Sequence, residues 1–208
     1  MSAARAAAAL IVGFARAITA VRGFWQGVAP VPSQRIYFAN HASHGDFVLV
    51  WTVLPRALRR RTRPVAGADY WQASRLKSFI GRDVFNAVLI DRDPATRAAD
   101  PVTQMSNALA TGDSLILFPE GTRNMGNQRL LPFKSGLFHL ATQNPEIDLV
   151  PVWIENLNRV MPKGAHVPIP LICTVTFGAA MRLNAQDKAT FLRRAEAALL
   201  ALAPPERP

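Results

Sequence analysis

Residues 40–46 read NHASHGD, a short polar stretch between two apolar runs that holds two histidines and an aspartate. A neutral imidazole is a suitable general base near neutral pH, and a carboxylate bonded to its other ring nitrogen fixes the tautomer and stabilises the imidazolium. The spacing between His41 and Asp46 is one that a turn opening a helix can close. The pair therefore predicts a base and its orienting group, which act on Ser43 or on a substrate hydroxyl.

A structural role is the alternative for the same stretch. Asp46 would then cap the following helix, and Asn40 would satisfy backbone groups of the turn. A metal site at His41 and His44 is disfavoured, because the other two histidines of the chain lie far away, in an apolar helical pattern and in a proline-rich loop.

A second polar stretch, FPEGTR at residues 118–123, ends another apolar run. Gly121 allows close approach of a ligand to the backbone, Thr122 offers a hydroxyl and Arg123 offers a planar fork for a phosphate. Glu120 would hold the arginine or bond a ligand hydroxyl. An ordinary strand-to-loop turn with a surface ion pair is the alternative interpretation.

A third polar stretch contains Arg92, which ends the apolar run VLI in the sequence VLIDRD. The acidic residues on either side of Arg92 allow a plain surface ion pair. A second phosphate contact from a neighbouring loop is equally compatible with the sequence.

The elements that must position these stretches follow from hydrophobic patterning. Short apolar runs predict strands, and they lie at residues 35–39, 64–68, 87–90, 114–121, 149–156 and 171–178. Helical patterns alternate with them, at residues 47–58, 71–82, 95–111, 133–143 and 185–203. This alternation predicts a single α/β domain over residues 31–208, with a mostly buried mixed sheet flanked by helices. Loops beyond the strand ends of such a sheet converge on one edge, so the three polar stretches are expected to meet.

Residues 1–30 predict an amphipathic helix ahead of that domain. An apolar stripe with helical spacing is formed by Leu10, Phe14, Ile18, Val21 and Trp25. Arginines interrupt the segment, and its longest apolar block is shorter than the ~20 residues that a membrane-spanning helix needs. The helix either lies in a membrane interface or packs on the rest of the domain.

Net charge narrows the class of partner. The 208 residues carry 24 Lys+Arg against 14 Asp+Glu, a formal charge of +10, which favours nucleic acid, phospholipid headgroups or phosphorylated small molecules. Nucleic acid is disfavoured because no aromatic stacking run or reading helix accompanies the charge. The basic cluster RRRTR (59–63) is a candidate docking patch, or simply a solvated loop. The single cysteine, Cys173, lies in an apolar run and is predicted to be in the core.

Taken in order, these stretches resemble the motifs of the glycerolipid acyltransferases, the family of lysophosphatidic acid acyltransferases. NHASHGD fits the family's Asn-His-x-Ser-x-x-Asp, and FPEGTR matches its third motif at every position. VLIDR is similar to the second motif, an apolar strand ending in arginine, and VPVWI (150–154) to the fourth. FKSG (133–136) fits the family's Phe-Lys-x-Gly. The set covers about residues 36–178, most of the chain.

The resemblance implies transfer of a fatty acyl chain from acyl-coenzyme A or acyl-acyl carrier protein to the free hydroxyl of 1-acyl-glycerol-3-phosphate, giving phosphatidic acid. His41 would take the proton of the hydroxyl, and Asp46 would orient the imidazole. The implied substrate-binding residues are Arg92, Glu120, Gly121, Thr122 and Arg123. No metal or other cofactor is implied.

The lipid substrates of the family also make membrane lipid an expected partner and favour the interfacial interpretation of the N-terminal helix. We therefore expect peripheral or monotopic attachment to the cytoplasmic face of the cell inner membrane. An acyltransferase acting on another lysolipid, such as lyso-ornithine lipid, is the alternative function. A hydrolase that uses Ser43 and a non-enzymatic basic module that binds nucleic acid are two further alternatives.

Overall fold

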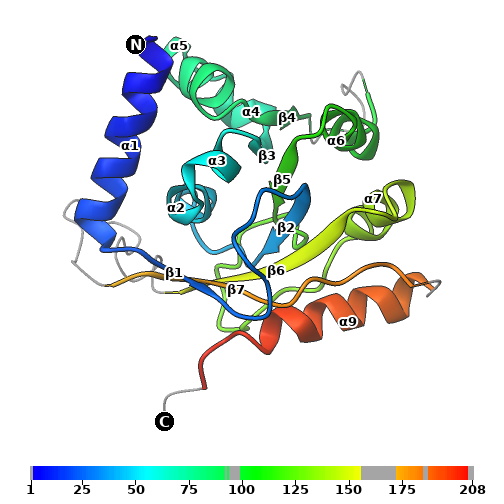
Figure 1. Ribbon diagram of the computed structural model, residues 1–208. Coiled ribbons are helices and arrows are strands. Elements are labelled where there is room, and N and C mark those ends of the chain that lie inside the picture. The colour runs from blue at the N-terminus through cyan, green and yellow to red at the C-terminus, as the bar shows by residue number, and fades with distance from the viewer. Residues whose placement is uncertain (1, 92, 94–98, 156–171, 185–186, 206–208) are drawn as a thin grey trace.

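A computed structural model describes residues 2–91, 93, 99–155, 172–184 and 187–205 of the chain (Figure 1). One seven-stranded sheet has the strand order β1-β7-β6-β2-β5-β3-β4. The strands are β1 (Arg22–Trp25), β2 (Arg35–Ala39), β3 (Thr62–Gly67), β4 (Val88–Ile90), β5 (Ser114–Leu117), β6 (Asp148–Glu155) and β7 (Thr174–Phe177). Every neighbouring pair is parallel except β6 and β7, so the predicted mixed sheet is confirmed.

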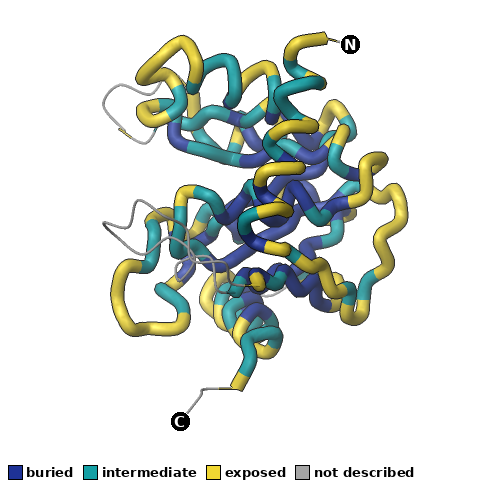
Figure 2. The backbone as a smooth tube through the Cα atoms, turned by 90° about the vertical axis from the view of Figure 1, so that its left-hand side faces the viewer, coloured by how far each residue is buried: buried dark blue, intermediate teal, exposed yellow. Residues whose placement is uncertain are grey.

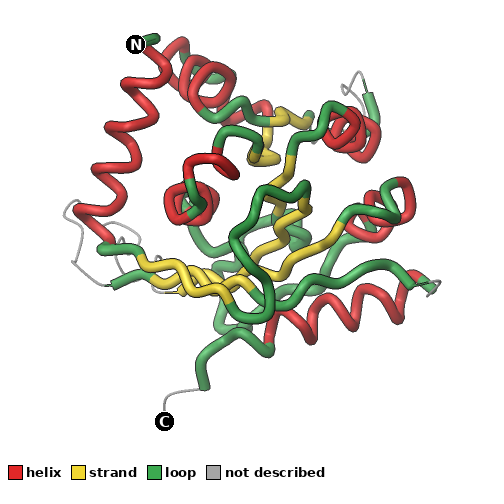
Figure 3. Tube along the Cα trace, viewed as in Figure 1, coloured by secondary structure: helices red, strands yellow, loops and turns green. Residues whose placement is uncertain are grey.

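Helices cover both faces of the sheet (Figures 1 and 3). They are α1 (Ala3–Thr19), α2 (Asp46–Val53), α3 (Arg56–Arg59), α4 (Ala68–Trp71), α5 (Arg75–Phe79), the π-helix η1 (Ile80–Val84), α6 (Pro101–Ala110), α7 (Gly136–Gln143) and α9 (Lys188–Leu200). The helices α1, α2 and η1 lie on one side of the sheet, and α6, α7 and α9 lie on the other.

The central strand β2 shows how the sequence builds two cores. Alternate side chains of a strand point to opposite faces. Tyr37 and Ala39 accordingly pack with α1 and α2, whereas Ile36 and Phe38 pack with α6, α7 and α9. Every residue of β2 is buried, as expected of a strand covered on both faces, and Figure 2 shows the buried residues concentrated in the interior of the molecule.

The N-terminal helix is shorter than predicted. It ends at Thr19, where Ala20 adopts a left-handed conformation with φ of 42°. Residues 22–25 then form β1, which pairs in parallel with β7, and the Trp25 ring stacks on Phe177 with ring centroids 3.9 Å apart. The prediction of a single helix that continues to Trp25 was therefore wrong over residues 20–25, because strand pairing with β7 replaces helical hydrogen bonding there.

The predicted apolar stripe is divided between two environments on α1, because Ile18 packs against the core whereas the first two members of the stripe do not. The buried residues of α1 are Val12, Ala15 and Thr19. Leu10 and Phe14 are instead 74% and 68% exposed. The helix therefore presents one apolar face to the core and a second apolar edge to its surroundings.

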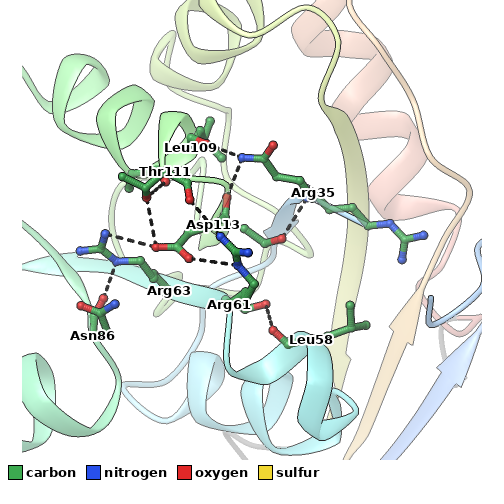
Figure 4. A network of polar contacts seen from close by, with 12 residues as sticks. Arg35, Leu58, Arg61, Arg63, Asn86, Leu109, Thr111 and Asp113 are labelled. Carbon is green, nitrogen blue, oxygen red and sulfur yellow. Dashed lines mark hydrogen bonds and ion pairs between the residues drawn. The ribbon is translucent and has the colours of Figure 1, made fainter. Parts of the chain in front are cut away.

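Most of the arginine cluster at residues 59–63 makes contacts within the chain. Arg61 and Arg63 approach the Asp113 carboxylate at 3.7 and 3.6 Å, and Arg63 also donates to the Asn86 carbonyl at 2.7 Å (Figure 4). Arg59 donates to the carbonyls of Thr52 and Leu54, each at 2.9 Å, at the end of α2. These arginines join neighbouring segments of the chain, a role that neither the docking patch nor the solvated loop anticipated.

The single cysteine is in the core, as predicted. Cys173 is fully buried beside β7. Burial, and to a smaller extent the charge of Asp46, raises the pKa of the Cys173 thiol to about 11. The thiol therefore stays protonated and unreactive near neutral pH.

Candidate active site

The turn between β2 and α2 brings His41 and Asp46 together. The Nδ1 atom of His41 lies 2.8 Å from Oδ2 of Asp46, and the side chains are 15% and 2% exposed. The same oxygen accepts the backbone N–H groups of Ala42 at 2.7 Å and Ser43 at 2.8 Å. An ionised carboxylate only accepts, so Nδ1 of His41 carries the proton and Nε2 keeps its lone pair. The imidazole is thus in the tautomer that a general base requires.

Two neighbouring residues fix this turn. The Asn40 side chain donates to the Ile154 carbonyl at 3.0 Å and accepts the Ile154 N–H at 2.8 Å, which ties the turn to β6. The Ser43 hydroxyl accepts the N–H of Gly45 at 3.3 Å within the turn. Ser43 is therefore engaged locally, and this arrangement gives no support to a serine hydrolase.

The loop after β5 contacts His41 at its ring, its backbone N–H and its backbone carbonyl. The Phe118 ring stacks on the imidazole with centroids 4.2 Å apart and planes 18° apart. The Oε1 atom of Glu120 accepts the N–H of His41 at 2.7 Å, and the N–H of Asn124 donates to the His41 carbonyl at 2.7 Å. The FPEGTR stretch therefore positions the histidine, a role that the sequence did not indicate.

Glu120 faces the backbone and does not line the cavity described below. It is 1% exposed, and its second oxygen accepts the N–H of Leu131 at 2.8 Å. Burial raises the pKa of the Glu120 carboxyl, against the opposing effect of the N–H groups of Leu131 and His41. Both oxygens are engaged by the main chain, so this geometry favours a positioning role over contact with a ligand hydroxyl.

Replacing Glu120 with glutamine tests that role. The amide keeps one accepting oxygen but loses the other, so the N–H of His41 or of Leu131 is left unpaired. An unpaired buried donor costs about 1–3 kcal/mol. We expect kcat for the acyl transfer that the sequence predicts to fall roughly tenfold while KM changes little, because the displaced group is His41 rather than a ligand contact.

The matched control for E120Q is Glu196→Gln. The Oε1 atom of Glu196 accepts the N–H of Phe133 at 2.8 Å, a similar carboxylate–backbone contact made from α9. Steady-state kinetics and urea unfolding of both variants distinguish an effect on the position of His41 from an effect on the free energy of unfolding. If E120Q and E196Q lose stability equally and neither loses kcat, Glu120 is only a structural residue.

A cavity of about 810 Å³ opens beside His41. Its lining includes Arg123 and Lys134, together with Gly121 and Thr122, while apolar and aromatic side chains from other elements form much of the remaining wall. His41 and Arg123 thus face the same cavity although they lie far apart in the sequence. Such a combination of a base, two cations and apolar walls suits an anionic substrate with a hydrocarbon part.

Gly121 adopts φ of +70°, a conformation that favours glycine. A side chain there would also lie 3.1 Å from Cγ of Lys134. The glycine therefore permits the close approach of the loop after β5 to Lys134, two residues ahead of α7. Arg92, the further predicted phosphate ligand, lies outside the described residues; its neighbours Ile90 and Asp91 line the cavity.

Comparison with known proteins identifies the family. Residues 26–155 match the family model described as Acyltransferase. The chain belongs to the acyltransferase family. It is 32% identical over 140 residues to the 1-acyl-sn-glycerol-3-phosphate acyltransferase of Haemophilus influenzae, which covers 61% of the chain and 52% of the relative. It is 35% identical over 124 residues to the human 1-acyl-sn-glycerol-3-phosphate acyltransferase alpha, covering 58% of the chain and 41% of the relative.

The fold is also found in a solved structure of this kind. The crystal structure of the 1-acyl-sn-glycerophosphate (LPA) acyltransferase from Thermotoga maritima matches with a TM-score of 0.68 and 18% identity, over 95% of this chain and 79% of that one. At this identity the likeness concerns the fold alone. The chain spans about half the length of the curated relatives it matches.

Sequence reasoning missed several residues of this acyltransferase site. Lys134 was visible only as part of the FKSG motif, and its place in the cavity depends on the approach of two loops. In the sequence, Phe118 is the last apolar residue of a strand pattern, and nothing there indicates that its ring stacks on His41. Asn124 acts through its backbone N–H, which carries no residue-specific signal.

The remaining histidine of the turn has a different environment. The His44 ring stacks on Tyr70 with centroids 5.0 Å apart and planes 12° apart, and both residues line the cavity. Within the described ranges, no three side chains of His, Cys, Asp or Glu come together as metal ligands.

Proposed function

We propose that the chain transfers a fatty acyl group from an acyl thioester to the free hydroxyl of 1-acyl-glycerol-3-phosphate, giving phosphatidic acid. The observation that carries the proposal is the shared cavity of His41, Arg123 and Lys134. It combines a general base with two cations that suit a phosphate, beside apolar walls that suit fatty chains. Relatives named for the same acceptor support it.

In the proposed mechanism, Nε2 of His41 removes the proton from the acceptor hydroxyl as the hydroxyl oxygen attacks the thioester carbonyl carbon. Asp46 stabilises the imidazolium that forms. The tetrahedral intermediate then collapses, the carbon–sulfur bond breaks, and the imidazolium returns the proton to the departing thiolate. The products are an ester and a free thiol, and the histidine regains its starting state without forming an acyl-enzyme.

Substrate positioning supplies much of the remaining rate enhancement. Arg123 offers a planar fork to the acceptor phosphate, and Lys134 offers a point charge at the start of α7, where unpaired N–H groups also favour an anion. The donor would be acyl-coenzyme A or acyl-acyl carrier protein. A lyso-ornithine lipid remains the alternative acceptor, although it lacks the phosphate that the two cations suit.

A single-turnover assay with the purified chain tests the proposed function. Lysophosphatidic acid and lyso-ornithine lipid are each offered with acyl-coenzyme A and with acyl-acyl carrier protein. We expect phosphatidic acid and free thiol in equal amounts from lysophosphatidic acid. Thioester loss without an acceptor would indicate a hydrolase, and preferential acylation of lyso-ornithine lipid would favour the alternative.

We also propose that α1 attaches the protein peripherally to the cytoplasmic face of the inner membrane. Leu10 and Phe14 lie one helical turn apart and are highly exposed. Arg5 and Arg16 of the same helix are exposed and add positive charge to it. Such an arrangement suits an anionic lipid surface. Among the described residues, no helix is both long and apolar enough to cross a bilayer.

Replacing both Leu10 and Phe14 with serine is expected to weaken binding to phosphatidylglycerol-containing vesicles at least about tenfold, because each buried side chain contributes about 1.5–3 kcal/mol. Co-sedimentation in low and high salt measures the effect. The matched control replaces two exposed apolar residues elsewhere, Val31 and Leu200, with serine. Equal sedimentation of all three proteins would contradict attachment through α1.

A further inference from the structure

Lys77 lies beside the cavity without lining it. Its Nζ atom is 4.0 Å from the centroid of the Tyr70 ring, a cation–π contact, and the Tyr70 ring also stacks on His44 with centroids 5.0 Å apart. Both Tyr70 and His44 line the cavity, and Tyr70 is 39% exposed, so it forms part of the rim. Two ring contacts therefore connect the ammonium group of Lys77 to the turn that contains His41.

The position of Lys77 is restrained at both its backbone and its side chain. Its N–H donates to the Ser74 hydroxyl at 3.3 Å, which is the N-cap contact of α5. The contact with Tyr70 holds the ammonium group at the end of a stem that is otherwise flexible. The charge is therefore placed where the cavity meets solvent.

The charge of Lys77 is not compensated by a carboxylate. Lys77 forms no ion pair with another residue of the ranges that the structure describes. The acidic residues on either side along the chain, Asp69 and Asp83, are exposed and do not pair with it. A lysine that is held at the rim of a cavity without a counter-charge attracts an anionic ligand to that rim.

This cation is distinct from the two that line the cavity. Arg123 lies on the loop after β5 and Lys134 just ahead of α7, whereas α5 packs against η1 on the other side of the sheet (Figure 1). The loop that carries Arg123 also bonds the backbone of His41. One set of cations is therefore coupled to the base, and Lys77 lies apart from it at the rim.

The two substrates of the proposed reaction carry their phosphates at different distances from the reacting atoms. In 1-acyl-glycerol-3-phosphate, the phosphate is attached to the carbon next to the one that bears the free hydroxyl. In acyl-coenzyme A and acyl-acyl carrier protein, the whole pantetheine arm separates the thioester sulfur from the nearest phosphate. The acceptor phosphate therefore needs a cation near His41, and the donor phosphate needs a cation farther out, at the rim.

We infer that Lys77 binds the phosphate of the phosphopantetheine arm of the acyl donor. This inference rests on the proposed function and gives the donor a site that is separate from the acceptor's Arg123 and Lys134. The chemistry recognised is the phosphopantetheine thioester, which coenzyme A and the acyl carrier protein both supply. Lysine suits a phosphate that enters and leaves in every turnover, because its compact charge does not require the fixed bidentate geometry of an arginine.

Replacing Lys77 with methionine tests the site, because methionine keeps an unbranched side chain against Tyr70 and removes the charge. The KM for the acyl donor should rise about five- to tenfold, as expected of a charge-assisted contact that solvent weakens. The KM for lysophosphatidic acid should stay unchanged. Lys77→Arg keeps the charge and should retain most of the affinity for the donor.

A donor without phosphate distinguishes phosphate binding from support of the fold. Acyl-pantetheine carries the same thioester but no phosphate, so K77M and the unaltered protein should use it with the same kcat/KM. An equal loss with acyl-pantetheine and with the phosphorylated donor would show that Lys77 only supports the Tyr70 ring. That result, or an unchanged KM for the phosphorylated donor, would overturn the inference.

Arg75→Ala is the matched control. Arg75 is exposed on the same helix, and residues two positions apart do not face each other, so R75A removes the same charge from another direction. An equal rise in donor KM for R75A and K77M would indicate general attraction by α5 and contradict a specific site. Weaker vesicle sedimentation of K77M with an unchanged donor KM would instead assign the lysine to a lipid surface.

Titration with phosphopantetheine and with pantetheine measures the same contact without turnover. Absence of acyl transfer by the unaltered protein would contradict the proposed function, and the titration would still decide the inference. K77M should bind phosphopantetheine about five- to tenfold more weakly and pantetheine equally well. Equal affinity of both proteins for phosphopantetheine would overturn the inference. Parallel transfer assays with acyl-coenzyme A and acyl-acyl carrier protein identify which carrier supplies the phosphate.

Discussion

Replacing His41 with alanine is expected to lower kcat for acyl transfer by about 10²- to 10⁴-fold, the range typical of a lost general base. The Nδ1 atom of His41 is held by Asp46 at 2.8 Å, and its ring is held by Phe118, so the imidazole is preorganised in one tautomer. The alanine variant keeps Arg123 and Lys134. Its affinity for an alkyl phosphate should therefore remain close to that of the unaltered protein.

Single-turnover kinetics and alkyl phosphate titration together check this expectation. The matched control is His139→Ala, which removes an exposed histidine on α7 outside the cavity. Transfer by the H41A variant within a few-fold of the unaltered rate would exclude His41 as the base. In that case the cavity would require a different proton acceptor, or a binding function without catalysis.

Replacing Arg123 with alanine is expected to raise KM for lysophosphatidic acid about ten- to a hundredfold. Charge-assisted hydrogen bonds contribute about 1.5–3 kcal/mol, and each 1.4 kcal/mol is about tenfold in affinity. Lysine at this position keeps the charge but loses the planar fork, so R123K should recover only part of the loss. A neutral monoacylglycerol acceptor should be acylated equally by all three proteins, because it offers no phosphate.

The control for Arg123 comes from the same loop. Arg129 lies over the Trp153 ring, 5.8 Å from its centroid, and does not line the cavity. The R129A variant should keep its KM for lysophosphatidic acid. An equal loss with the phosphate-bearing and the neutral acceptor in R123A would show that the arginine supports the loop and does not bind phosphate.

The sequence predicts those parts of the site that depend on local spacing or on the general topology of α/β sheets. His41 and Asp46 lie five residues apart across a strand-to-helix turn, so their contact follows from local geometry. The approach of residues 118–123 to that turn follows from the parallel order of β2 and β5, whose carboxyl ends lie at one edge of the sheet.

Other features depend on partners that the sequence does not specify. The carboxylate of Glu120 bonds two backbone N–H groups, and any residue supplies such a group, so no pattern predicts its direction. The end of α1 was missed for a similar reason. Apolar residues continue at helical spacing to Trp25, but pairing of Arg22 with Thr174 joins positions about 150 residues apart and overrides the local pattern.

The position of β1 has a consequence for shortened forms of the protein. β1 covers the outer side of β7, and backbone hydrogen bonds continue past both ends of the pair: the N–H of Cys173 donates to Thr19 at 2.9 Å, and the N–H of Gln26 donates to Phe177 at 2.7 Å. Removing the first 26 residues would leave β7 with a row of unpaired backbone groups, a template for aggregation. Insolubility of such a fragment would result from the loss of β1, and it would not measure the affinity of the protein for lipid.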